Sequence, residues 1–207
     1  MKRTFAQTNP AQLGFDDFLS EADTINKAVA FERTHGHLPG TMEEALPFYC
    51  DLTQKHHAAM LAADHDTVMA LREEASKLAL KLNDGEPGIL ASPDAPGCRL
   101  ASLSAAPDGA VPLWGQAGRF IIEVNAMRVH IDMDGIFGIG AGFMPWMNFS
   151  ANAVEWDKPF LSETGYRSFM GLHAALVPGL SPDAFAREVI GGYVKRELKG
   201  KLRAIKR

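Results

Sequence analysis

The spacing of apolar residues predicts three amphipathic helices in the first part of the chain. Between residues 15 and 29, apolar side chains recur every three or four positions, which is the period of one helix face. Thr41 and Glu44 have the spacing of a capping box, so a second helix is expected to begin beside Thr41. A third apolar seam covers residues 68–82 and stops at residues 83–85. Three successive helices with short joints predict a helical hairpin or three-helix unit.

Glycine and proline punctuate residues 84–118, where few apolar runs exceed three residues. This composition is typical of a loop. Some short strands are expected within it, because a structureless loop of that length is unusual in a compact domain. The change in composition marks the expected boundary between a helical region, residues 1–84, and an α+β region, residues 85–207. One compact domain that contains both regions is the alternative.

Alternating apolar and polar positions predict strands in the second half of the chain. Residues 119–124 are rich in β-branched and aromatic side chains, which favour strands. Over residues 127–134 apolar and polar side chains alternate with the period of a half-buried strand. The Asp134-Gly135 pair is a strong hairpin-turn signal, so a glycine-rich third strand is expected to follow it over residues 136–143.

Two helices are expected at the C-terminal end of the chain. The first covers residues 166–176, with Ser162 as a candidate N-cap. The second begins at Ser181, an N-cap residue type followed by Pro182 at the first helical position. The whole pattern predicts an α+β fold: an N-terminal helical hairpin or three-helix unit, a small antiparallel sheet near residues 119–143 and two C-terminal helices.

Composition narrows the class of protein. Hydrophobic residues make up 46% of the chain and charged residues 22%, which is ordinary globular usage. No apolar run approaches the roughly 18 residues of a membrane-spanning helix, so no membrane partner is expected. Two cysteines, Cys50 and Cys98, fit a reducing compartment. No apolar stretch follows Lys2 and Arg3, so no signal peptide is expected and the expected location is the cytoplasm.

Positive charge is concentrated at the end of the chain. Residues 195–207 contain seven basic residues and one acidic residue, a net +6, and because the whole chain carries −4, the other 194 residues carry −10. This asymmetry predicts a nucleic acid or an acidic protein as partner. The alternative is that the cations oppose the negative end of a helix dipole. The candidate binding residues are Lys195, Arg196, Lys199, Lys201 and Arg203.

The segment 156–169 is the densest group of polar and aromatic residues in the chain. If Ser162 caps a helix, the free N–H groups of that helix and Arg167 would form an anion site. Trp146 and Trp156 could stack a base or another ring. The alternative is a structured loop whose side chains satisfy one another. The candidate contact residues of this segment are Trp156, Glu163, Tyr166 and Arg167.

A strand would place His130, Asp132 and Asp134 on one face, where they could bind a divalent cation or act as an acid–base set. Alternating polar residues are equally typical of a solvated sheet face. The other histidines lack the spacing of a zinc site. The glycines between residues 135 and 142 do not precede a helix, so they do not predict a dinucleotide site.

These observations favour a non-enzymatic binding or regulatory protein without a cofactor. It would contact nucleic acid or an acidic protein through its basic tail, with residues 156–169 as a second contact. The alternative is a small enzyme or ligand-binding protein that uses residues 156–169, or a metal at His130, Asp132 and Asp134. Convergence of Glu163, Tyr166, Arg167 and His130 on one pocket would favour this alternative.

Overall fold

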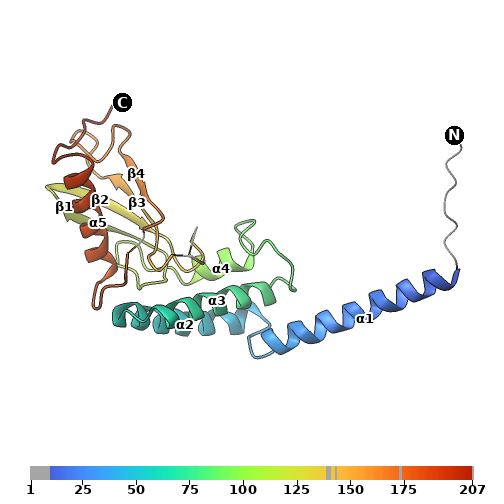
Figure 1. Ribbon diagram of the computed structural model, residues 1–207. Coiled ribbons are helices and arrows are strands. Elements are labelled where there is room, and N and C mark those ends of the chain that lie inside the picture. The colour runs from blue at the N-terminus through green and yellow to red at the C-terminus, as the bar shows by residue number, and fades with distance from the viewer. Residues whose placement is uncertain (1–9, 139–140, 143, 173, 207) are drawn as a thin grey trace, which may run out of the picture. The chain divides into compact units, whose positions relative to one another are not determined.

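A computed structural model describes residues 10–138, 141–142, 144–172 and 174–206, with side chains described from residue 19 onward. The described residues form an α+β fold, as the sequence predicts, with helices followed by a four-stranded antiparallel sheet and a final helix (Figure 1). The chain divides into two compact units, residues 1–38 and 39–207. The second unit contains the sheet and all helices except α1, and a boundary at residue 84 stays a prediction.

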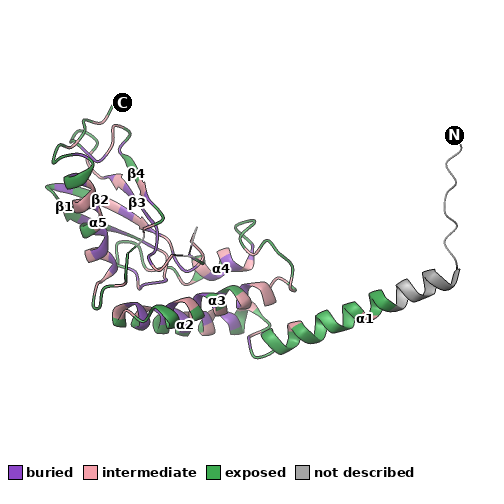
Figure 2. Ribbon diagram, viewed as in Figure 1, coloured by how far each residue is buried: buried purple, intermediate pink, exposed green. Residues whose placement is uncertain are grey.

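The first unit contains one long helix, α1 (Pro10–His35). It begins earlier than the expected start near residue 15 and ends at the predicted place. Its described surface is largely exposed (Figure 2), including the apolar side chains of Leu19, Ile25 and Val29. Lys27 pairs with Asp23 one turn earlier, which is a helix-stabilising spacing.

The helices α2 (Met42–Ala62) and α3 (His65–Lys81) form the predicted hairpin. The Thr41 side chain accepts a hydrogen bond from the Glu44 N–H, so the expected N-cap is confirmed. Ala63 adopts a left-handed conformation, with φ of 56°, and ends α2. A short fourth helix, α4 (Pro96–Leu103), packs on both and was not predicted.

The sheet contains β1 (Gly118–Val124), β2 (Met127–Met133), β3 (Phe149–Ala153) and β4 (Tyr166–Phe169), in that order. All neighbouring strands are antiparallel. The alternation predicted over residues 127–134 is confirmed in β2, where every second residue is buried, and β1 alternates in the same way as far as Ile122. A tight turn at Asn125 and Ala126, both with positive φ, joins these two strands.

The third strand is not where the sequence predicts it. The described residues 136–138 and 141–142 lie in turns, and the strand that pairs with β2 is β3. The Ile136 N–H donates to the Gly115 carbonyl, and the Gly135 backbone packs so closely that a Cβ would lie 2.9 Å from the same oxygen. The chain at Gly135 therefore passes against a distant loop instead of folding back on β2.

The helix expected over residues 166–176 is wrong. The first four of these residues form β4, and Ser162 does not cap a helix. Its hydroxyl donates to the Tyr166 carbonyl and accepts from the Tyr166 N–H, which closes a turn before the strand. Gly165 in this turn has a φ of 71°, a conformation that favours glycine. The anion site expected at that helix N-terminus is therefore absent as well.

The described chain after residue 166 contains one helix, α5 (Pro182–Arg196). Ser181 is its N-cap, as predicted. The helix packs against the sheet (Figure 1). On the buried face of the sheet the Phe185 ring contacts the rings of Trp114, Trp146 and Phe149. Among the described residues, no helix combines the length and the apolar character that crossing a membrane requires. The packing of α5 directs the basic end of the chain past the β1–β2 turn.

Candidate functional site

The basic tail is hydrogen-bonded to the 156–169 segment through the backbone of Arg203 and Lys206. After α5 the buried side chain of Leu198 anchors the chain, and Gly200 turns it in a left-handed conformation. Arg203 then pairs with Phe160 through two backbone hydrogen bonds, each 2.8 Å long. The Lys206 N–H donates to the Glu163 carbonyl at 2.8 Å. The structure thus brings together the two segments that the sequence identifies as candidate contacts.

The tail cations are only partly balanced by the protein's own carboxylates. The Lys206 ammonium lies 2.7 Å from a carboxylate oxygen of Glu163. This hydrogen bond and ion pair hold the pKa of Glu163 below its usual value. Arg196 donates to the Gly192 carbonyl on its own helix. Four exposed cations make no ion pair within the part of the chain that the structure describes, namely Lys195, Lys199, Lys201 and Arg203.

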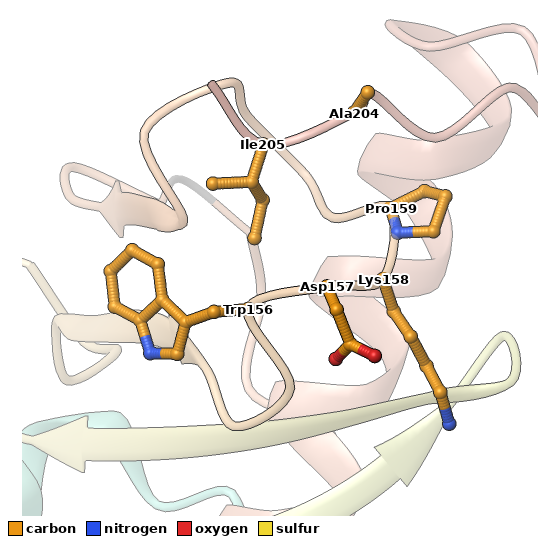
Figure 3. Close-up of a pocket in the computed structure, with 6 residues that line it drawn as sticks. All are labelled: Trp156, Asp157, Lys158, Pro159, Ala204 and Ile205. Atoms are coloured by element: carbon orange, nitrogen blue, oxygen red, sulfur yellow. The ribbon is translucent and has the colours of Figure 1, made fainter. Parts of the chain in front are cut away.

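An open hollow of about 430 Å³ lies between the tail and the loop that follows β3 (Figure 3). It is lined by residues 156–159 of the loop and by Ala204 and Ile205 of the tail. In Figure 3 the indole of Trp156 and the side chain of Ile205 lie on one side of the close-up, whereas Asp157 and Lys158 extend from the loop on the other. The Trp156 side chain is 51% exposed.

Two further hollows continue this surface. One lies between Lys158, Arg128 of the β1–β2 hairpin and Leu202 of the tail, and the other between Asn125 and Lys199. Lys158 is held at 2.8 Å from Glu155, and this contact raises the pKa of Lys158. We call this region the tail surface, and it comprises residues 125–128, 155–160 and 195–206.

The candidates Glu163, Tyr166, Arg167 and His130 do not converge on one pocket. The strand register aligns Tyr166 with His130 through Asn152 on the outer face of the sheet, two strands apart. Arg167 belongs to the opposite face, where its guanidinium lies 4.7 Å from the ring centroid of Tyr193. Glu163 is engaged by the tail. Convergence of these residues on one pocket would have favoured an enzyme or a ligand-binding protein, and this arrangement gives that alternative no support.

The candidate metal ligands lie on and just beyond β2. His130 and Asp132 are on the outer face, and Asp132 is paired with Arg119 at 3.1 Å. Asp134 follows the strand, and burial and the Asp132 charge raise its pKa. Within the described residues, no group of three or more His, Cys, Asp or Glu side chains is placed to hold a metal ion. The geometry gives the metal alternative no support, and it stays a prediction.

Trp146 does not offer a ring for stacking, because it is 4% exposed and packs inside the aromatic core. Its indole N–H donates to the Ala174 carbonyl. Of the two tryptophans that the sequence suggests for stacking, only Trp156 is accessible in the described structure.

Sequence reasoning missed a buried polar cluster around Arg72. Its guanidinium donates to His56 and to the carbonyl oxygens of Ala141, Met144 and Pro145. Burial lowers the pKa of Arg72 to about 10 and that of His56 to about 4. Because each guanidinium nitrogen already has a partner, the cluster has a structural role. The two residues lie on different helices, and no local pattern in the sequence could have paired them.

The comparisons with known proteins cover part of the chain. No family model matches it, and no solved structure matches it. Two curated relatives from Escherichia coli, both named Protein KlcB, are 35% identical over 120 residues and 33% identical over 114 residues. Each match covers 54% of this chain, and 25% and 27% of the respective relative. The chain therefore spans about a quarter of the length of these relatives, whose name states no activity.

Proposed function

We propose that this protein is a non-enzymatic binding protein that engages nucleic acid through its tail surface. The observation that carries the proposal is the set of four exposed tail cations without an ion pair among the described residues. Lys195 lies in the last turn of α5, and the other three belong to the segment that pairs with Phe160 at Arg203. A held array of cations binds a regularly spaced polyanion at a smaller entropic cost than a flexible tail would.

The negative charge of the rest of the protein favours the approach of a polyanion to the tail. The first 194 residues carry −10, so a polyanion is repelled by most of the protein and attracted by the tail. Phosphates that are neutralised by lysine or arginine release bound counterions, which makes binding weaken steeply with salt. This dependence on salt is the signature that the proposal predicts.

The placement of the other candidates supports a binding role over the alternative of a small enzyme. Glu163 is used to hold Lys206, and Arg167 packs over Tyr193. Neither residue faces a shared cavity with His130, which lies on the outer face of the sheet. Glu163 and Arg167 are therefore not placed to act together with His130 and Tyr166 on the outer face of the sheet.

The decisive experiment replaces the tail charges without removing the tail. Deletion of residues 195–207 would also remove the buried Leu198 and the pairing with Phe160, so its result would be ambiguous. We instead compare the unaltered protein with a variant that carries K195Q, K199Q, K201Q and R203Q. Its matched control carries the same charge change at helix cations that form ion pairs elsewhere, namely K27Q, K55Q, K77Q and R187Q.

Fluorescence anisotropy with labelled oligonucleotides at several salt concentrations gives the readout. The tail variant should bind at least about tenfold more weakly at low salt, and its slope of log K against log salt should be shallower by about 3 to 4. The control should keep most of the affinity and the slope. Equal affinity of the tail variant and the control would contradict the proposal. Binding of polyglutamate but of no oligonucleotide would assign the surface to an acidic protein instead.

A further inference from the structure

We infer that the hollow beside Trp156 receives an unpaired nucleobase, so that the nucleic acid bound by the tail surface is single-stranded. This inference rests on the proposed function and adds the class of nucleic acid to it. Three features of the hollow carry it: a positioned and accessible indole, a carboxylate in its lining and cations along its border.

The indole of Trp156 is accessible and is also held in position. It is half exposed, whereas Trp114 and Trp146 are buried. On one side the indole packs against Gly165, where an added Cβ would lie only 2.8 Å from its ring. A ring that is fixed before binding offers a stacking surface without an ordering cost.

The charge inside the hollow favours a base over a phosphate. Asp157 is exposed and lines the hollow together with Trp156 and Lys158, and the Lys158 ammonium is held 2.8 Å from a carboxylate oxygen of Glu155. A carboxylate repels a phosphate, but it accepts hydrogen bonds from the N–H groups of a base. At about 430 Å³ the hollow also falls within the range of about 300–1,000 Å³ that is usual for ligand sites.

The cations of the tail that precede the hollow are not among its lining residues, and a phosphate backbone would run along them. Lys201 and Arg203 precede Ala204 and Ile205 in the tail, and both are exposed. A strand that places one base on Trp156 can therefore place its neighbouring phosphates along the tail. A base in a duplex has both faces covered by its neighbours, so it cannot reach the indole unless it leaves the stack.

The test compares single and double strands of about 12 nucleotides on the full chain. The unaltered protein should prefer the single strand. Trp156→Ala should weaken single-strand binding by about 5- to 150-fold, the loss expected for one stacked base. Duplex and heparin binding should change by less than about twofold, because neither uses the indole. Trp156→Phe, which keeps a stacking ring, should retain most of the single-strand affinity.

Intrinsic fluorescence gives a second readout, since Trp156 is the exposed tryptophan among the three in the chain. Single strands should protect it from acrylamide quenching, whereas heparin should not. Asp157→Asn should tighten heparin binding and reduce the preference for the single strand.

The outcomes separate the two proposals. Equal affinity for single strand and duplex, or a Trp156→Ala variant that binds single strands normally, would overturn the base site. If the base site is overturned but the tail variant still loses affinity for oligonucleotides, the proposed function stands without the base site. If no oligonucleotide binds the unaltered protein at low salt, both proposals fail.

Discussion

Arg72 donates a hydrogen bond from its Nε to the Nε2 of His56 across 3.0 Å, and both side chains are buried. Neither forms an ion pair with a carboxylate among the described residues. The Nδ1 of His56 contacts the Trp114 carbonyl at 3.0 Å, and the Trp114 N–H donates to His57. The backbone carbonyl and N–H of one residue, Trp114, are thus bound by two adjacent histidines. The pair connects α2 and α3 to the loop before β1, and Arg72 extends the connection to the segment before β3.

Replacement of Arg72 should destabilise the protein severely. Arg72→Met removes the donors that satisfy His56 and the carbonyls of Ala141 and Pro145, and buried acceptors without donors are costly. We expect a loss of about 3–5 kcal/mol in the free energy of unfolding, measured by urea denaturation, because three buried acceptors lose their donors at about 1–3 kcal/mol each. Arg72→Lys should not rescue it, because an ammonium cannot reproduce the planar donor geometry.

The matched control for this measurement is Arg187→Gln, which breaks an exposed ion pair with Asp183 on α5. Exposed pairs contribute little, so its free energy of unfolding should change by no more than about 1 kcal/mol. A loss at Arg72 as small as that at Arg187 would contradict the role assigned to the buried cluster.

Stability should fall as the pH is lowered through the range in which His56 would ordinarily be protonated. Burial first, and then the Arg72 charge, lowers the pKa of His56 to about 4 from 6.5. The unfolded chain therefore binds a proton at His56 that the folded protein excludes. The stabilisation is complete above about pH 6.5 and declines toward pH 4, by at most about 3 kcal/mol.

Urea unfolding between pH 7 and pH 4.5 measures this decline, and comparison with His56→Gln isolates it from the titration of carboxylates. The variant should be less stable at pH 7 but should show a shallower dependence on pH between 6.5 and 4.5. An equal slope in both proteins would show that His56 is not held neutral by the fold.

The starts of α2 and α5 could be predicted because capping depends on residues that are close in sequence. Thr41 and Glu44 are three positions apart. Ser181 likewise needs only Ala184. These contacts form in the same way whatever the rest of the chain does, so a local pattern identifies them.

The strands β3 and β4 and the candidate site depended on contacts between distant residues. Residues 166–169 became β4 because β3 offered them a partner, and that pairing outweighs a weak helical pattern. Charge and aromatic content drew attention to the tail and to residues 156–169 separately. Their meeting depends on the pairing of Arg203 with Phe160, which no local pattern encodes.

Gly165 should tolerate no side chain, because its φ of 71° is strained for other residues and a Cβ would collide with Trp156. Gly165→Ala should cost about 1–2 kcal/mol from the backbone conformation alone. It should also displace the indole, and a shift in the fluorescence of Trp156 would record this movement. The control Gly40→Ala has open space around the new Cβ and should alter neither property. Unchanged fluorescence in Gly165→Ala would contradict the positioning of the indole.

The ion pair between Glu163 and Lys206 should restrain nucleic-acid binding. Glu163→Gln removes a negative charge beside the tail and releases the Lys206 ammonium, which lies 2.7 Å from the carboxylate. On the proposed function, this change adds one cation to the tail surface. We expect binding of oligonucleotides to tighten by about 3- to 10-fold at low salt and the salt slope to steepen by about 0.7 to 0.9.

Glu73→Gln, which releases Lys77 on α3 in the same way, is the matched control and should leave both quantities unchanged. Equal gains in the two variants would show that net charge alone governs binding, and would remove the special role of the tail surface.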